Sequence, residues 1–136
     1  MEHTNFSAYF HTLNSMKNYD SIEIMIKNKK QSLGMENFLM HMGGKWKPIL
    51  LWNIHLGINR FGLLEKALPK ITKQMLSQQL KDLESQKMVN RKIYAEIPPR
   101  VEYTLTKLGT SLIPVLNAMQ HWGEEQLAKH EVLSLF

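Results

Sequence analysis

The spacing of apolar and polar residues predicts a series of helices from Met35 onward. The first of them ends at the pair Gly43 and Gly44, because glycine adopts the left-handed conformation that closes a helix at no steric cost. The segment "KWKPILLWNIHLG" predicts a second helix, with Pro48 in its first turn and Gly57 at its end. This helix is apolar on nearly all sides, so we expect it to be the buried central helix, with its tryptophans Trp46 and Trp52 in the core.

Two further helices follow. "FGLLEKAL" predicts a short helix that ends at Pro69, and "ITKQMLSQQLKDLESQKMV", residues 71–89, predicts a longer one with Thr72 as its N-cap. At about 100° per residue, one side of the longer helix carries leucines and the other side is polar. The leucines are Leu76, Leu80 and Leu83, and the polar residues are Gln74, Ser77, Gln78, Lys81 and Ser85. The acids of this helix, Asp82 and Glu84, lie toward its C-terminal half.

The spacing then changes from helical to nearly alternating in "VNRKIYAEIPPRVEYTLT". Two short runs of β-branched and aromatic residues flank Pro98 and Pro99 there, which predicts an antiparallel hairpin. The chain closes with "TKLGTSLIPVLNAMQHWGEEQLAKH", which predicts a long helix. Pro114 lies inside that helix and indicates either a kink or a late start.

The first 33 residues carry a weaker pattern. "NFSAYFHTLNSM" is typical of a short amphipathic helix, "SIEIMI" of a strand or a second helix, and "KNKKQ" of a turn or an exposed end. We therefore divide the chain into an N-terminal extension over 1–34, one folded domain over 35–125 and a C-terminal tail over 126–136.

Composition narrows the classes of protein that this chain can represent. A length of 136 residues with 43% hydrophobic residues suits one ordinary core. No apolar run approaches the ~20 residues of a membrane span, and the N-terminus lacks the pattern of a secretion signal, so we expect a cytoplasmic protein. The chain has no cysteine, which excludes disulfides, thiolate catalysis and thiol redox switches within it.

Positive charge is concentrated in the middle of the chain. Between Lys45 and Lys107 there are 12 Lys and Arg against 5 Asp and Glu, a balance of +7, while the remainder has a balance of −2. This excess favours a partner with a phosphate backbone, although an acidic protein or a membrane surface would also be attracted.

Enzyme chemistry is poorly represented. The sequence has no glycine-rich phosphate loop, no nucleophile elbow and only two aspartates, Asp20 and Asp82. His121 and Glu124 are one helical turn apart, a spacing that can hold a metal, but this pair alone does not supply the third and fourth ligands that a metal site needs. We therefore expect no catalytic site, no cofactor and no metal.

The order of the predicted elements is that of a winged helix-turn-helix, in which the second helix of the turn enters the DNA major groove and the hairpin lies beside it. Glutamine can bond adenine at N6 and N7, serine can pair with several base edges, and lysine can reach guanine or a phosphate. The polar face of residues 71–89 is suited to reading bases. Two other readings remain: the face is ordinary solvated surface, or the winged helix binds only proteins. The hairpin cations also have two readings: they contact DNA, or they merely keep a sheet edge soluble. These cations are Arg91, Lys92 and Arg100.

Three motifs resemble the HxlR-type winged helix-turn-helix transcriptional regulators of bacteria. They are "GGKWKPILLW", "RFGLLEKALPKITKQMLSQQLKDLE" and "EIPPRVEYTLTKLGTSLIPVL", and the resemblance runs from about Met35 to about Glu125. It implies a mainly α, MarR-like fold with a small β-hairpin and a long C-terminal dimerisation helix. It also implies a cytoplasmic homodimer that binds a near-palindromic operator, more often as a repressor. Position by position, the groove-facing residues would be Lys73, Gln74, Ser77, Gln78 and Lys81, and the basic wing would be Arg91, Lys92 and Arg100.

The sequence departs from this family at one point. Many members sense oxidants through a cysteine followed by proline, ten residues ahead of the double glycine, where this chain has Leu33 and Gly34. Thiol sensing therefore cannot be carried over. The protein would have to sense its signal without a thiol. One possibility is a small-molecule effector bound between the N-terminal segment, the central helix and the long C-terminal helix.

Apolar residues that the domain does not need for its own core favour a dimer. Three apolar segments would otherwise be exposed to water. They are the stripe at Phe38 and Met42, the stripe at Met119 and Trp122, and the tail "VLSLF". Two-fold pairing would supply it and would set two recognition helices about one DNA turn apart. The alternative is that the N-terminal residues cover the stripes within one chain.

Overall fold

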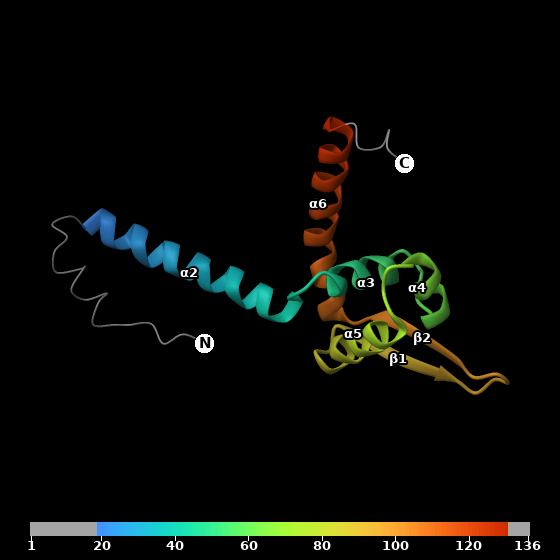
Figure 1. Ribbon diagram of the computed structural model, residues 1–136. Coiled ribbons are helices and arrows are strands. Elements are labelled where there is room, and N and C mark those ends of the chain that lie inside the picture. Colours follow the sequence, from blue (N-terminus) through green and yellow to red (C-terminus); the bar gives the residue numbers. More distant parts are fainter. Residues whose placement is uncertain (1–18, 131–136) are drawn as a thin grey trace. The chain divides into compact units, whose positions relative to one another are not determined.

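The computed structural model describes residues 19–130 (Figure 1). The elements in chain order are α2 (Tyr19–Met42), α3 (Trp46–His55), α4 (Phe61–Ala67), α5 (Lys73–Ser85), β1 (Val89–Tyr94), β2 (Arg100–Leu105) and α6 (Lys107–Lys129). The chain divides into two compact units, one ending at Gly43 and the other beginning at Gly44. The predicted fold class, mainly helical with one hairpin in winged helix-turn-helix order, is confirmed. Within residues 19–130, none of the helices is both long and apolar enough to cross a bilayer.

Helix α2 is longer than the sequence pattern indicated. "SIEIMI" is helical, so the strand alternative was wrong, and "KNKKQ" lies inside the helix rather than in a turn. Lysine, glutamine, glutamate and methionine are good helix formers, and no proline interrupts this stretch, so local propensity extends the helix toward the N-terminus. Its end is as predicted, because α2 stops at Met42 and Gly44 has a φ of +86°. The segments "NFSAYFHTLNSM" and "VLSLF" lie outside the described residues.

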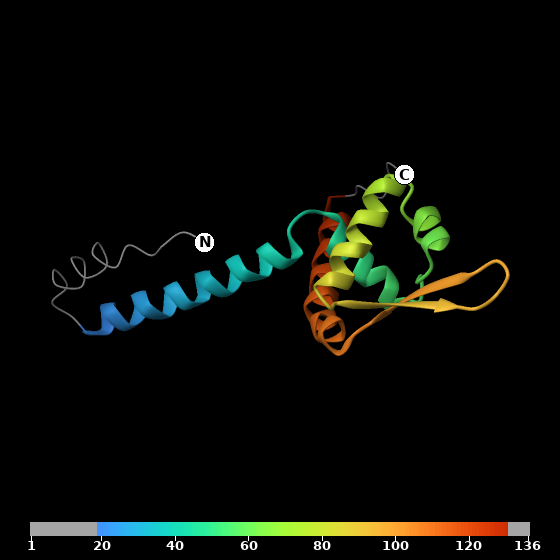
Figure 2. The same ribbon diagram turned by 90° about the horizontal axis from the view of Figure 1, so that it is seen from below.

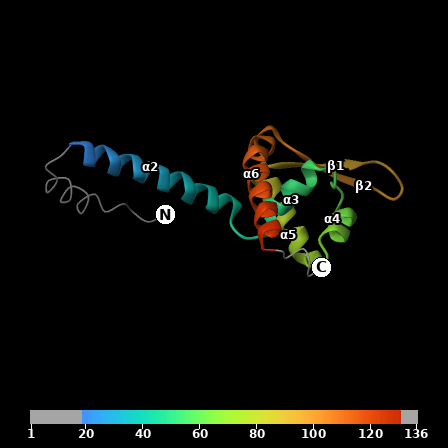
Figure 3. The same cartoon turned by 90° about the horizontal axis from the view of Figure 1, so that it is seen from above.

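Helix α3 is the centre of the second unit. It contacts α5, α6 and β2, and it lies between α6 and α4 (Figures 1 and 3). The buried apolar residues of this unit are Leu50, Leu51, Ile54, Leu64, Ile71, Leu76, Leu80, Leu83, Met88, Val89, Tyr103 and Leu116. The prediction that Trp46 and Trp52 lie in the core was wrong, since both are only half-buried. Residues from one side of α3 fill the core, and a unit of this size has too few elements to cover its remaining sides.

The ends of α3 and α5 close in the same way. At the end of α3, the Gly57 nitrogen donates to Ile54 O and the Ile58 nitrogen donates to Asn53 O, with Gly57 at a φ of +91°. This is a Schellman motif, and it confirms Gly57 as the stop. At the end of α5 a lysine, Lys87, takes the left-handed position with a φ of 60°.

Strands β1 and β2 pair antiparallel in the register Val89 to Leu105 through Tyr94 to Arg100, which confirms the predicted hairpin. The backbone before α4 is hydrogen-bonded to β2, because the Tyr103 nitrogen donates to Asn59 O at 2.8 Å. Figure 2 shows the hairpin extending beyond the helices of this unit. Its base is therefore anchored to the core while its far end is open to solvent.

Helix α6 is joined to the start of β1 by Thr106. The Thr106 hydroxyl accepts from the Gly109 nitrogen at 3.0 Å and donates to Lys87 O at 2.6 Å. This cap starts α6 at Lys107, so the late start that Pro114 suggested was wrong and the helix continues through the proline. Gly109 is buried, and a Cβ built on it would overlap the backbone oxygen of Met88.

We expect Gly109→Ala to lower the free energy of unfolding by about 1–3 kcal/mol, because the added methyl group forces α6 away from the Met88 backbone. Urea denaturation followed by circular dichroism measures this. Gly62→Ala in α4 is the matched control, since a Cβ there meets nothing within 4 Å. Alanine is the better helix former, so Gly62→Ala should leave stability unchanged or raise it by up to about 1 kcal/mol. Equal effects of the two changes would contradict the close contact.

Candidate nucleic-acid interface

Helix α5 presents one face to the core and one to solvent. Its first turn is capped as predicted, since the Thr72 hydroxyl accepts from the Met75 nitrogen at 3.1 Å. Leu76, Leu80 and Leu83 are all 0 or 1% exposed, which confirms them as the core face. Because α5 contacts α3, α4 and β1 through that side, its opposite side is left open.

The predicted groove-facing residues all lie on the open side of α5. Lys73, Gln74, Gln78 and Lys81 are exposed, and Ser77 is half-buried. Within residues 19–130, the side chains of Lys73, Gln74, Ser77 and Lys81 form no hydrogen bond or ion pair. Four side chains rich in donors are therefore free to bind a polar ligand.

Gln78 differs from these four because it is held in place. Its Nε2 donates to Asp82 Oδ1 at 3.0 Å, and Asp82 Oδ2 lies 3.8 Å from the Nζ of Lys47 in α3. The Lys47 side chain is only 12% exposed. The sequence pattern placed Asp82 away from the entering end of the helix and did not indicate its link to Lys47.

A hollow of about 370 Å³ separates α5 from the hairpin. It is lined by Phe61, Ser77, Lys81, Glu84, Arg91, Val101 and Tyr103. The fold thus brings the polar face of α5 and the wing cation Arg91 to opposite sides of one concave surface. The sequence analysis had expected the hairpin beside this helix, but it did not indicate which wing cation faces α5.

The opposite face of the hairpin holds a cluster of charged side chains around Tyr94. The Nζ of Lys92 lies 4.8 Å from the Tyr94 ring centre, and the Cζ of Arg100 lies 4.0 Å from it. Arg100 is also 3.3 Å from Glu96 and 3.6 Å from Glu102. It therefore differs from the free wing cation that the sequence suggested, because two carboxylates offset its charge.

Glu102 connects this cluster to the helix-turn-helix. Its Oε1 lies 3.3 Å from the Nη2 of Arg60, the residue before α4, and the Glu102 side chain is 18% exposed. Sequence reasoning missed Arg60, Glu102 and Lys47 because their partners lie in other elements, 42 positions apart in the case of Arg60 and Glu102. It also missed Tyr94, whose ring lies near Lys92 of its own strand and near Arg100 of β2. No periodicity within one element signals such a pair.

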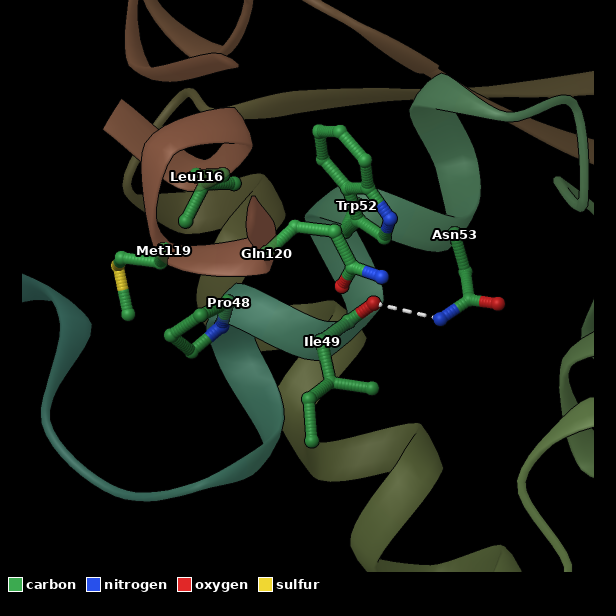
Figure 4. Close-up of a pocket in the computed structure, with 7 residues that line it drawn as sticks. All are labelled: Pro48, Ile49, Trp52, Asn53, Leu116, Met119 and Gln120. Atoms are coloured by element: carbon green, nitrogen blue, oxygen red, sulfur yellow. Dashed lines mark hydrogen bonds between the residues drawn. The ribbon is translucent and has the colours of Figure 1, made fainter. Parts of the chain in front are cut away.

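A second hollow lies between α3 and α6, with a volume of about 290 Å³ (Figure 4). Pro48, Ile49, Trp52 and Asn53 line it from α3, and Leu116, Met119 and Gln120 line it from α6. The two amides already have partners, since Asn53 Nδ2 donates to Ile49 O at 2.8 Å and Gln120 Nε2 donates to Glu124 Oε1 at 2.8 Å. The surface is largely apolar and favours no particular ligand chemistry.

His121 and Glu124 face each other as their spacing implied, with 3.8 Å between Nδ1 and Oε2. Both are well exposed, at 66% and 58%. Nowhere in the part of the chain that the structure describes do three His, Cys, Asp or Glu side chains gather as a metal site would require.

Comparison with known proteins agrees with this geometry. The profile of the HxlR-like helix-turn-helix family matches residues 41–131. The chain is 46% identical over 105 residues to a protein of Fusobacterium mortiferum whose name describes it as a regulatory protein, MalR, covering 76% of this chain and 98% of MalR. It is 45% identical over 91 residues to the HTH-type transcriptional regulator YdeP of Bacillus subtilis (strain 168), covering 67% of this chain and 71% of YdeP.

A solved structure is similar as well. The redox regulator HypR in its oxidized form superposes with a TM-score of 0.64 at 41% sequence identity, over 68% of this chain and 95% of HypR. HypR therefore shares the fold of this chain over the superposed part.

We expect Thr72→Ala to lower the free energy of unfolding by about 1 kcal/mol, because the Met75 amide at the start of α5 loses its acceptor. Thr72→Ser keeps the hydroxyl and should retain most of the stability. Thermal unfolding of the three proteins, compared at one temperature, checks this. A loss as large for serine as for alanine would show that the hydroxyl is not what stabilises the first turn.

Proposed function

The chain belongs to the HxlR-like helix-turn-helix family and is a transcriptional regulator, and on that premise we propose that it binds a specific double-stranded DNA site as a homodimer. The proposed site is a near-palindromic operator and the proposed effect is repression, in the cytoplasm where such DNA lies. The observation that supports this most directly is the open face of α5, where Lys73, Gln74, Ser77 and Lys81 have no partner within residues 19–130.

We assign the α5 residues to the major groove. Gln74, Ser77 and Gln78 carry the hydrogen-bonding groups that distinguish base edges, and the helix places them at i, i+3 and i+4 on one surface. Lys73 and Lys81, at the two ends of that row, can reach guanine or the flanking phosphates. The first turn enters the groove most deeply in this class of motif, so the open N-terminal half of α5 suits the role.

We assign the hairpin to the DNA backbone. Arg91 and Lys92 are exposed and have no carboxylate partner in the described part of the chain. Arg100 takes a lesser share in the proposal, because Glu96 and Glu102 offset its charge and hold it against Tyr94. Phosphate contacts of this kind position a protein on the duplex, while the base contacts of α5 specify the sequence.

The proposed dimer is supported by the surface of α6. Val115, Met119, Trp122 and Leu127 are 47%, 50%, 67% and 41% exposed. Their positions along the helix differ by three, four or five residues, so they lie on neighbouring faces of α6, and a symmetric partner would bury this apolar area. Met42, which was expected to need a partner, is already 4% exposed, while Leu39 and Met40 of α2 remain 56% and 72% exposed.

A small-molecule effector, if the protein answers one, has a place in the apolar hollow between α3 and α6. Movement of α6 relative to α3 would alter the proposed dimer and with it the spacing of the two α5 helices. HypR is named a redox regulator, but this chain has no cysteine, so a thiol cannot carry such a response here.

The experiment that tests the proposal is selection of bound sequences from a random duplex pool. We expect two inverted half-sites with centres about 10 base pairs apart, one helical turn. Failure of every sequence to enrich would refute sequence-specific binding. Enrichment of a single unrepeated site would refute the dimer arrangement.

Binding to random duplex should weaken with salt, by a slope of about −0.9 in log affinity against log salt for each phosphate neutralised. Lys92→Ala should make the slope shallower by about one such contact per protomer, and Arg100→Ala by less, because two carboxylates already offset the arginine. Fluorescence anisotropy at several salt concentrations measures both. Lys129→Ala, at the far end of α6, is the control and should leave the slope unchanged. A flat response in the wild type would instead favour a winged helix that binds only proteins.

Trp122→Lys should convert the proposed dimer to a monomer, because it places a charge in an apolar interface without touching the core. Sedimentation velocity at several protein concentrations checks this. Leu63→Lys is the matched control, since Leu63 is 45% exposed on α4, away from α6, and should leave the mass unchanged. An unaltered mass for Trp122→Lys would remove α6 from the interface.

A further inference from the structure

Three side chains connect the core to the open face of α5. Lys47, from the buried side of α3, faces Asp82 Oδ2 at 3.8 Å, and Asp82 Oδ1 accepts from Gln78 Nε2 at 3.0 Å. Each oxygen of the Asp82 carboxylate therefore has one partner. The Lys47 side chain is 12% exposed and the Asp82 side chain 38% exposed, so the anchor is packed while the glutamine lies in solvent.

This contact decides which end of the Gln78 amide faces the carboxylate. An ionised carboxylate can only accept hydrogen bonds, so the NH₂ group of Gln78 must face Asp82 and the carbonyl oxygen must face away. Within residues 19–130 nothing donates to that oxygen. One N–H of the amide is also still available, because the NH₂ group has two donors and Asp82 takes one.

The free acceptor and the remaining donor match one base best. In the major groove adenine offers a donor at N6 beside an acceptor at N7, which satisfies both groups of the amide. Cytosine offers only the donor at N4. Guanine and thymine offer acceptors there, which would leave the Gln78 oxygen facing another oxygen or nitrogen lone pair.

We infer that Asp82, anchored by Lys47, is a positioning residue that orients Gln78 to select adenine in each half-site. The inference rests on the proposed function and deepens it, since it names a base that the DNA site should contain. Lys47 has a second effect here. It offsets the charge of a carboxylate that would otherwise repel the duplex from the recognition helix.

Gln74 provides a comparison within the same helix. It lies one turn before Gln78 on the same face and has no hydrogen-bond partner within the described residues. Its amide can present either end to a base, so it should tolerate more than one base where Gln78 does not.

Selection from a random duplex pool, run on four proteins, tests the inference. The position read by Gln78 is the one whose preference disappears in Gln78→Ala. At that position the wild type should favour adenine over guanine by about 5- to 150-fold, the range for a two-point contact. Asp82→Asn frees the amide to turn and should lower that preference toward the Gln78→Ala value. Glu84→Gln, the control, removes the same charge from α5 without touching Gln78 and should keep the preference.

Each outcome is decisive. A preference for guanine, thymine or cytosine at the Gln78 position overturns the inference, as does a preference that Asp82→Asn and Glu84→Gln preserve equally or lower equally. Both results leave sequence-specific binding intact. No enrichment at all by the wild type refutes the proposed function instead, and in that case the second measurement still tests the orientation.

That second measurement needs no DNA. In the free protein, ¹⁵N relaxation of the side-chain amides should show a more ordered NH₂ group for Gln78 than for Gln74. Asp82→Asn should reduce the order at Gln78 to that at Gln74, while Glu84→Gln should not. Equal order at the two glutamines in the wild type would show that Asp82 does not hold Gln78, and would overturn the inference.

Discussion

Burial of three leucines on one side of α5 is the constraint on which the rest of this surface depends. Leu76, Leu80 and Leu83 are almost wholly removed from water, and a helix that commits one side to the core must turn its other side to solvent. The glutamines and lysines of α5 are exposed for that reason. Substituting one of these leucines would loosen the polar face, proposed to read bases, as well as the core, because the two faces belong to one helix.

Cations offset the charge of most acidic residues in the basic segment. Of the five between Lys45 and Lys107, three are paired with cations: Asp82 with Lys47, Glu96 with Arg100, and Glu102 with Arg60 and Arg100. Partly exposed pairs contribute little to stability, commonly less than about 1 kcal/mol. Their value here is geometric, because Glu102 fixes the hairpin to the residue before α4 and Asp82 fixes a glutamine on α5.

The two faces of the hairpin have different surroundings and therefore different roles. On one face, Val89 and Tyr103 are buried and Arg91 opens onto the hollow beside α5. On the other, Lys92 and Arg100 lie against Tyr94. Alternation along a strand sends neighbouring side chains to opposite faces, so three wing cations that are close in sequence and register differ in exposure and in charge partners. The term basic wing, applied to all three residues, does not describe this difference.

Much of the fold followed from the sequence alone, because local chemistry decides it. Helix periodicity, the Thr72 cap, the stop at Gly57 and the alternation of the hairpin depend on residues within a few positions of each other, and each was predicted. Predictions from the local sequence were wrong where contacts with other elements decide the burial of a residue or the start of a helix. The tryptophans of α3 are half-buried, and Pro114 lies within α6 because Thr106 is held by the Lys87 backbone. The candidate interface divides in the same way. Its residues on α5 could be named from spacing, but the links from Lys47 to Asp82 and from Arg60 to Glu102 could not, since hydrogen bonds and ion pairs between distant residues exist only after the chain has folded.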